Sequence, residues 1–276
     1  MALGNIGKQI RDTLTGTIKG AGDVVGSSIE VTRNTIVESL RGVRDITSEV
    51  AGMATDAVAG SISAANQVGT EAGSAVKGTV IGVIKGVGEV GTVTAGTISD
   101  TIRAAIKGTT EVGGDVNTTT RSAVEGVITT TGSISLSLQD TTFSIARGAM
   151  GGARDTGADM ASIAKATMIG AIAGTNEITG DVMQAIKGTS QGLIKGTSEV
   201  GGDLATVAQK SVEGAIEGSR QIGVAAEDAA STAATGAVEA AGNVSEGAVN
   251  TVRDAVSGTI AGVKVVLKAP FKKEEK

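Results

Sequence analysis

The sequence is built on a repeat of eleven residues, which limits the possible fold more than any other feature. Residues 106–116 read IKGTTEVGGDV, and residues 194–204 read IKGTSEVGGDL. The two segments agree at nine of eleven positions and begin eight repeats apart (194 − 106 = 88 = 8 × 11). Rows of eleven laid out from Gly7 reach Pro270 without a gap, because 24 × 11 = 264. Self-similarity at a fixed period predicts a repeat architecture.

The rows alternate in type, so the full unit is two rows long (2 × 11 = 22). Isoleucine begins the rows of one type at Ile62, Ile84, Ile106, Ile128, Ile172, Ile194 and Ile216. The fifth place of the other type is basic at Arg33, Lys77, Arg121, Lys165, Lys187 and Arg253. Apolar positions separated by three and four residues indicate a helical face, and an eleven-residue period keeps that face aligned. We therefore predict an all-α protein, one long amphipathic helix or several, with these isoleucines as its apolar stripe.

Glycine recurs in phase with the same unit and forms six GxxxG pairs. The pairs are Gly82/Gly86, Gly148/Gly152, Gly170/Gly174, Gly192/Gly196, Gly214/Gly218 and Gly258/Gly262. Small residues at this spacing let helix backbones approach closely, so we predict that these glycines pack helices together. Each glycine also costs a helix about 1 kcal/mol relative to alanine. With 42 glycines in 276 residues, we expect the helices to be ordered only by assembly or by a surface.

Two alternatives to one continuous helix stay open. A β-solenoid with 22-residue coils would suit the abundant Thr, Val, Ile and Gly. Glycine doublets at residues 113–114, 151–152 and 201–202 could instead mark turns between stacked helical hairpins. In either case we assign residues 1–6 to the N-terminal end, 7–270 to the repeat region and 271–276 to a charged C-terminal tail, with Pro270 ending the last helix.

Composition excludes several function classes. The chain has no Cys and no His, so it offers no thiolate or imidazole metal site, disulfide or histidine base. A net charge of −5 argues against nucleic acid as a partner. The longest uncharged stretches, residues 57–70 and 126–139, are shorter than the roughly 18 residues needed to span a bilayer. With no signal peptide in the first residues, we expect a location in the cytoplasm or at the periphery of a membrane or droplet.

The remaining motifs predict no chemistry. Residues 86–91 read GVGEVG, a formal GxGxxG, but other repeat copies read GTTEVG and GTSEVG, so a dinucleotide site is not predicted. Acidic pairs such as Glu111/Asp115 and Glu199/Asp203 recur four residues apart. We interpret them as a solvated face rather than a metal site. We therefore expect a protein that is not an enzyme, with no cofactor and no bound metal.

The charges also suggest a register between neighbouring helices. Acids such as Glu199 and bases such as Lys187 occupy alternate rows. A neighbouring helix staggered by eleven residues would place acids beside bases, which favours specificity more than affinity. The alternative is that these residues only keep the surface hydrated.

The repeats resemble those of perilipins and synucleins, most clearly at residues 194–200 (IKGTSEV) and 209–215 (QKSVEGA). The resemblance is one of period and composition. It implies a chain that is unfolded when free and forms long amphipathic helices on lipid droplets or membranes. The regular acidic pairs disfavour anionic membranes, and the fixed phase of the glycines is not something that lipid binding requires.

Two functions therefore compete. In the first, a non-enzymatic structural protein packs its repeat helices side by side through GxxxG faces into a filament, tube, sheet or barrel-like assembly of identical chains. In the second, the apolar stripe coats a lipid droplet, membrane or polymer granule. The expected partners are accordingly other copies of the chain or such a surface.

Overall fold

The computed structural model describes residues 4–21, 23–41 and 46–267, and within them the protein is all-α. The helices are α1 (Asn5–Ala21), α2 (Val24–Leu40), α3 (Ile46–Val68), α4 (Ala72–Val90), α5 (Ala95–Glu111), α6 (Val116–Thr129), the short 3₁₀ helix η1 (Thr131–Ser133), α7 (Leu138–Thr156), α8 (Met160–Glu177), α9 (Val182–Val200), α10 (Leu204–Gln221), α11 (Ala226–Gly242) and α12 (Glu246–Val256). Two short strands follow, β1 (Gly258–Ile260) and β2 (Val263–Val265). The predicted fold class is confirmed at this level, and neither a β-solenoid nor one continuous helix is formed.

One helix and its turn occupy each 22-residue unit. From α6 to α11 the helices begin at Val116, Leu138, Met160, Val182, Leu204 and Ala226, and each start follows the previous one by a full unit (138 − 116 = 22). At the N-terminal end, α1 begins at Asn5, two residues before the first expected repeat. The period in the sequence therefore corresponds to the distance along the chain from one helix to the next.

Glycine and aspartate end and begin these helices. Gly69, Gly113, Gly157 and Gly201 recur at intervals of two units and have φ of 72°, 68°, 69° and 70°, a left-handed conformation that terminates helices and favours glycine. The next helix begins with an acidic cap: the Asp203 carboxylate accepts hydrogen bonds from the backbone N–H groups of Ala205 and Thr206 at 3.0 and 3.3 Å. The glycine doublets at 113–114 and 201–202 lie in such turns, whereas that at 151–152 lies inside α7.

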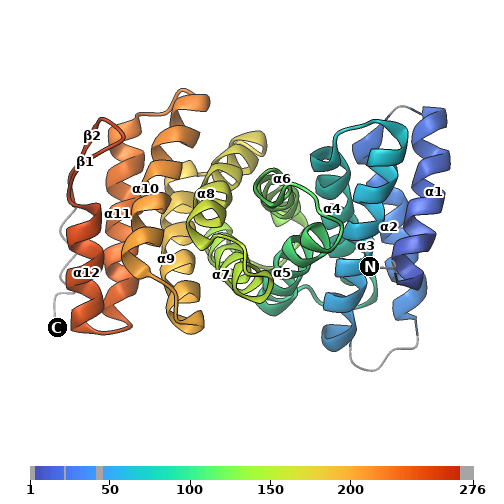
Figure 1. The fold of residues 1–276 in the computed structure, drawn as a ribbon, viewed down its shortest axis with the longest axis horizontal. Helices are drawn as coiled ribbons and strands as arrows, with labels where there is room; N and C mark the ends of the chain where they lie inside the picture. The colour runs from blue at the N-terminus through green and yellow to red at the C-terminus, as the bar shows by residue number, and fades with distance from the viewer. Residues whose placement is uncertain (1–3, 22, 42–45, 268–276) are drawn as a thin grey trace.

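The helices form two layers, one of odd-numbered and one of even-numbered helices. Each helix packs against the helix two positions away, and short turns reverse the chain between consecutive helices. Gly148 and Gly152 of α7 face Ser99 and Arg103 of α5. Both partners advance by four residues, so these two helices run parallel. Figure 1 shows the resulting elongated stack, with α1 and α2 at one end and α11 and α12 at the other.

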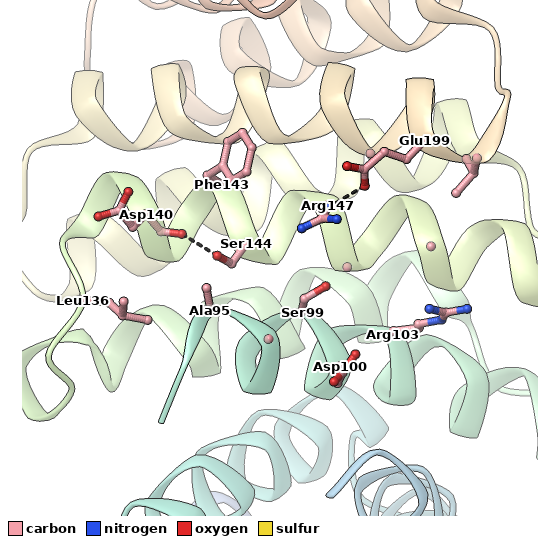
Figure 2. A pocket seen from close by; sticks show the side chains of 15 residues that line it. Ala95, Ser99, Asp100, Arg103, Leu136, Asp140, Phe143, Ser144, Arg147 and Glu199 are labelled. Carbon is pink, nitrogen blue, oxygen red and sulfur yellow. Dashed lines mark hydrogen bonds and ion pairs between the residues drawn. The ribbon is translucent and has the colours of Figure 1, made fainter. Parts of the chain in front are cut away.

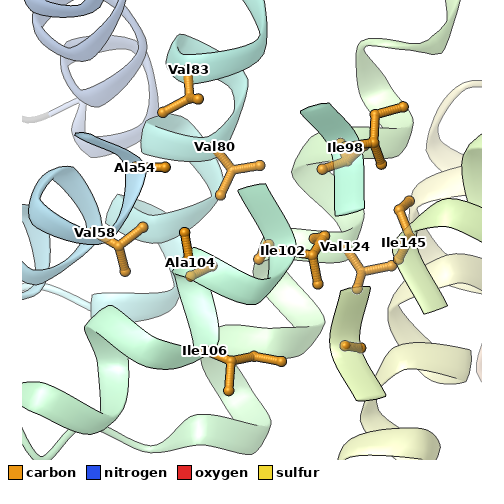
Figure 3. Packing of buried hydrophobic residues seen from close by; sticks show 14 of the residues in the cluster. Ala54, Val58, Val80, Val83, Ile98, Ile102, Ala104, Ile106, Val124 and Ile145 are labelled. Atoms are coloured by element: carbon orange, nitrogen blue, oxygen red, sulfur yellow. The ribbon is translucent and has the colours of Figure 1, made fainter. Parts of the chain in front are cut away.

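The core between the layers is made of Ile, Val and Ala. In Figure 3, Ile98 and Ile102 of α5, Val124 of α6 and Ile145 of α7 meet in this interior, and all four side chains are fully buried. No aromatic side chain is buried among the described residues. Small and branched side chains fill the space because the backbones lie close together.

The last part of the repeat region is not helical, which corrects the prediction for residues 257–265. Helix α12 ends at Val256, and β1 pairs with β2 in an antiparallel hairpin that joins Ile260 to Val263. Gly258 and Gly262 have φ of 95° and 79°. They therefore belong to this hairpin, not to a helix-packing pair as the sequence predicted. Pro270 and the tail, residues 271–276, lie outside the described residues.

No helix in the described ranges is both long enough and apolar enough to cross a membrane.

Candidate functional site

Glycine lines the contacts between parallel helices of the same layer. A Cβ atom at Gly170 of α8 would lie 2.6 Å from the carbonyl oxygen of Arg121 in α6, and one at Gly214 of α10 would lie 2.9 Å from that of Lys165 in α8. Gly192 meets the carbonyl oxygen of Phe143 in the same way. In each case the sequence number of the partner is lower by 49 (170 − 121 = 214 − 165 = 192 − 143 = 49). Only glycine allows the backbones to approach so closely.

The second glycine of each helical pair lies on the same contact. Cβ atoms at Gly174 and Gly196 would lie 3.0 Å from the Cα atoms of Glu125 and Arg147. Ten of the twelve predicted packing glycines therefore lie between helices, the exceptions being Gly258 and Gly262. These ten are Gly82, Gly86, Gly148, Gly152, Gly170, Gly174, Gly192, Gly196, Gly214 and Gly218. All their contacts are made within one chain.

The GxxxG criterion missed other glycines with the same environment. Gly108 packs against the carbonyl oxygen of Thr55 at 2.6 Å, Gly126 against that of Lys77 at 2.8 Å and Gly236 against that of Lys187 at 3.1 Å, measured from an ideal Cβ. The last two contacts repeat the same difference in sequence number (126 − 77 = 236 − 187 = 49). The recurrence of glycine once in each 22-residue unit is the signal that identifies Gly126 and Gly236, without a second glycine four positions on. Gly108 lies one unit after Gly86, at the second place of a pair whose first place is Ala104.

The predicted isoleucine stripe lies in the interior. Ile62, Ile84, Ile106, Ile128, Ile172, Ile194 and Ile216 are each exposed by 1% or less. The stripe that could have faced a lipid surface therefore faces the neighbouring helices of the stack.

Acids and bases pair between helices two positions apart. Lys165 Nζ lies 2.7 Å from Glu217 Oε2, and Lys187 Nζ lies 2.9 Å from Glu239 Oε2. The two sequence numbers differ by 52 in both pairs (217 − 165 = 239 − 187 = 52). We call the set of ion pairs with this spacing the 52-residue ladder. Its members are about a third to a half exposed, so each contributes about 0–1 kcal/mol and acts mainly on register.

Longer bridges join even-numbered helices four positions apart. Lys77 of α4 reaches Glu177 of α8 at 2.6 Å, and Arg121 of α6 donates to Gln221 beside the end of α10 at 3.0 Å. Both bridges span 100 residues and pass across an intervening helix. Even-numbered helices four positions apart therefore lie within reach of one another's long side chains.

Acidic residues of the recurring pairs cap helices at the turns or form ion pairs of the 52-residue ladder. Asp115, Asp159 and Asp203 cap α6, α8 and α10. Hydrogen bonds from the hydroxyls of Thr118, Ser162 and Thr206 are the main reason that the pKa of each carboxyl is lowered. Among the described residues no three acidic side chains are grouped as a metal site requires.

The GVGEVG segment also lacks the setting of a nucleotide site. Residues 86–90 lie inside α4 and Gly91 caps its C-terminus, whereas a dinucleotide fingerprint follows a strand and opens a helix.

The arrangement defines a class of architecture: a two-layered stack of antiparallel helix pairs that winds as an α-solenoid. No known protein family matches the sequence, and no curated protein is significantly similar to it.

Proposed function

We propose that this chain is a non-enzymatic structural protein whose helices pack side by side through small-residue faces. The observation that supports the proposal most directly is the constant 49-residue step between Gly170, Gly192 or Gly214 and the carbonyl oxygen that each one meets. A repeated contact with one geometry builds an extended body from nearest-neighbour interactions. In this proposal the eleven-residue period keeps the glycines and isoleucines on the buried sides of each helix, and the stack supplies the energy that orders glycine-rich helices.

The stack is proposed to be finite because a hairpin covers the face beyond α11 and the outer face of α1 is polar. At the C-terminal end, Ile260, Val263 and Val265 of the hairpin are buried against the last helices. The N–H of Val266 also donates to the Ser231 hydroxyl of α11 at 3.3 Å. The hairpin thus lies where a further odd-numbered helix would pack.

At the N-terminal end, the outer face of α1 is polar. Gly16 lies two units before Gly60, yet no described atom lies within 4 Å of its Cβ position. Lys8 and Asp12 are exposed beside it. Polar terminal repeats of this kind keep solenoids from adding further units. Association between copies, which the sequence also predicts, would accordingly use the sides of the stack.

A lipid or granule coat is not favoured by any contact described above. It would require the seven buried isoleucines to leave the core, and therefore the stack to open.

Light scattering on a size-exclusion column and electron microscopy test this proposal across a range of protein concentrations, without lipid. We expect compact particles of one size and a strongly helical circular-dichroism spectrum at every concentration. Filaments that lengthen with concentration would contradict the proposal that the stack is finite. A disordered spectrum would contradict the proposal that the chain orders itself.

A further inference from the structure

Two grooves of the described structure differ in their relation to the repeat. The larger, about 580 Å³, lies across α5, α7 and α9, where Figure 2 shows Arg147 already paired with Glu199. The second, about 350 Å³, lies along the C-terminal half of α10 and reaches the turn of the hairpin at Ala261. It is lined on α10 by Glu213, Ile216, Glu217, Arg220 and Gln221. This second groove lies beside the one part of the repeat region in which the structure replaces helix by strand.

The chain beside the second groove repeats the sequence of the end of α10. Residues 212–222 read VEGAIEGSRQI, and residues 256–266, two units later, read VSGTIAGVKVV. Both have Val, Gly, Ile and Gly at the same alternate places, followed by a basic residue. The first segment is helical through Gln221, whereas the second forms β1 and β2. One sequence pattern therefore has two conformations in the same molecule.

Helix α12 ends early by the length of the hairpin. It has 11 residues, whereas α8 and α10 have 18 each. Two units after Gln221, the last residue of α10, lies Val265 (221 + 44 = 265), which is also the last residue of β2. The nine residues by which α12 stops short (265 − 256 = 9) are therefore those that the hairpin occupies.

Gly218 of α10 indicates where the missing turns of α12 would pack. A Cβ atom at Gly218 would lie 2.9 Å from Cδ1 of Ile172 in α8. Two units later the same two positions are Gly262 and Ile216 (218 + 44 and 172 + 44). Ile216 lines the second groove. A helix that continued through residues 257–265 would therefore enter this groove, by the contact that already joins α10 to α8.

The hairpin holds the segment with a turn that does not suit its sequence. The two turn residues, Ala261 and Gly262, have φ of 48° and 79°. Such turns favour Asn or Gly at the first place, because a left-handed backbone is costly for alanine. Each strand has only three residues, and a two-stranded hairpin is marginal by itself. Burial of Ile260 and Val263 against the last helices therefore holds it in place.

We propose that residues 257–265 are a conformational switch at the C-terminal end of the stack. In the first state they form the hairpin, which lies alongside α11 beyond the end of α12 (Figure 1), and the N–H of Val266 donates to the Ser231 hydroxyl at 3.3 Å. In the second state they extend α12 by about two and a half turns into the groove along α10. The face of α11 around Ser231 is then uncovered. The consequence, that the switch decides whether a further helix can pack on this end, rests on the proposed function.

Substitutions in the turn should move the segment between its two states. Gly262→Ala removes the residue that favours a left-handed turn and adds helix propensity, so the ratio of helix to hairpin should rise at least about 10-fold. The extended helix can accept this methyl group, because the atom nearest the equivalent Gly218 is the movable end of a side chain. Ala261→Asn, which completes an Asn-Gly turn, should lower the same ratio. Gly247→Ala, at an exposed glycine of α12, is the matched control and should leave residues 257–265 unchanged.

NMR chemical shifts of the Cα carbons of residues 257–265 measure the two states. We expect strand-like shifts in the parent and in the Ala261→Asn protein, and helical shifts in the Gly262→Ala protein. The backbone amide of Val266 should at the same time lose its protection against hydrogen exchange, because the helix carries it away from the Ser231 hydroxyl.

A disulfide gives an independent measure of the hairpin. Thr259 and Lys264 are exposed and face each other across the two strands, so cysteines at these positions lie within disulfide distance. In a helix the same two positions are about 7.5 Å apart along the axis, which is too far for the bond. Thr259→Cys with Lys264→Cys should therefore form a disulfide readily in the parent, and at least about 10-fold less readily when Gly262→Ala is added.

The proposal is overturned if residues 257–265 remain a hairpin in the Gly262→Ala protein, with the disulfide formed as readily as in the parent. It is equally overturned if the segment loses its strand-like shifts without gaining helical ones. Either result leaves the compact helical particle of the proposed function intact, whereas loss of that particle in the parent protein would contradict the proposed function instead.

Discussion

Arg147 of α7 and Glu199 of α9 form an ion pair, Nε to Oε2 at 2.5 Å, across 52 residues of chain. The same step joins Arg103 to Asp155 one helix pair earlier. Because the step is two full units plus eight residues, each pair connects a helix to the parallel helix two positions on, about two turns further along. Charges that could have matched one chain to another match the helices of a single chain to each other.

Gly192 should tolerate no side chain. Gly192→Ala places a methyl group against the carbonyl oxygen of Phe143, and the helices must separate to accommodate it. We expect a loss of about 1–3 kcal/mol in the free energy of unfolding, measured by urea denaturation.

Gly52→Ala is the matched control for that variant, because Gly52 is an exposed helical glycine of α3 with no atom within 4 Å of its Cβ position. It should gain up to about 1 kcal/mol from helix propensity. A Gly192→Ala protein as stable as the Gly52→Ala protein would contradict the packing account.

Buried threonine hydroxyls should be sites of easy stabilisation. The side chains of Thr167 and Thr189 are fully buried, and their hydroxyls have no hydrogen-bond partner among the described residues. Thr→Val keeps the branched shape and removes the unsatisfied group, so each variant should gain about 1–2 kcal/mol. Thermal unfolding measures the gain.

Thr197→Val provides the contrast, because this buried hydroxyl donates to the Leu193 carbonyl at 2.7 Å. The substitution removes a made hydrogen bond and should be neutral or destabilising. If all three variants lost stability equally, the hydroxyls of Thr167 and Thr189 would have to be satisfied in solution.

The aspartate caps should make the protein sensitive to acid. The pKa of Asp115, Asp159 and Asp203 is lowered below the usual 3.8 in the folded chain. These carboxylates therefore add stability above about pH 4, and that stability is lost as the pH falls through the folded pKa values. We expect the free energy of unfolding to fall steeply below about pH 4.

Replacing all three caps by Asn tests this cause. Asparagine caps helices about as well as aspartate at neutral pH but does not titrate. The triple variant should match the parent near neutral pH and decline less as the pH falls below about 4. If the triple variant lost stability below about pH 4 as steeply as the parent, other carboxylates would be responsible for the acid sensitivity.

Thr179 should be improved by glycine. Its φ of 52° is left-handed, a conformation that costs a β-branched residue about 1–2 kcal/mol. The equivalent position two units later is Gly223, with φ 74°. Thr179→Gly should raise the midpoint of thermal unfolding, whereas Gly223→Thr should lower it. Opposite shifts would mean that the turn between α8 and α9 differs from the one between α10 and α11.

The all-α class and the buried face of each helix could be predicted from the sequence, because the repeat period and the regular positions of the glycines follow from the local geometry of a helix. Ile106 and Ile194 could be placed on one face from their spacing alone. The breaks between helices were harder to find, since Gly113 at a turn and Gly108 at a helix contact look alike in the sequence. Only the φ angle that tertiary structure imposes distinguishes them.

The sequence could not predict which helix packs against each buried face. A helix with Gly192 and Gly196 on one side packs equally well on a copy from another chain or on α7 of its own. Whether the helix packs on another chain or on its own chain depends on whether the chain reverses direction between helices.

Packing of each helix on the helix two positions away, within one chain, is the central claim, and cross-linking tests it most directly. The chain has no Cys, so Arg147→Cys with Glu199→Cys creates a single pair, to be treated with a short bismaleimide at several protein concentrations. Arg147→Cys with Glu246→Cys, which places the second thiol on α12, is the control. The account predicts rapid cross-linking of the first pair within one chain, at a rate independent of concentration, and little for the control. Cross-linked dimers that increase with concentration, with no bridge inside a chain, would contradict it.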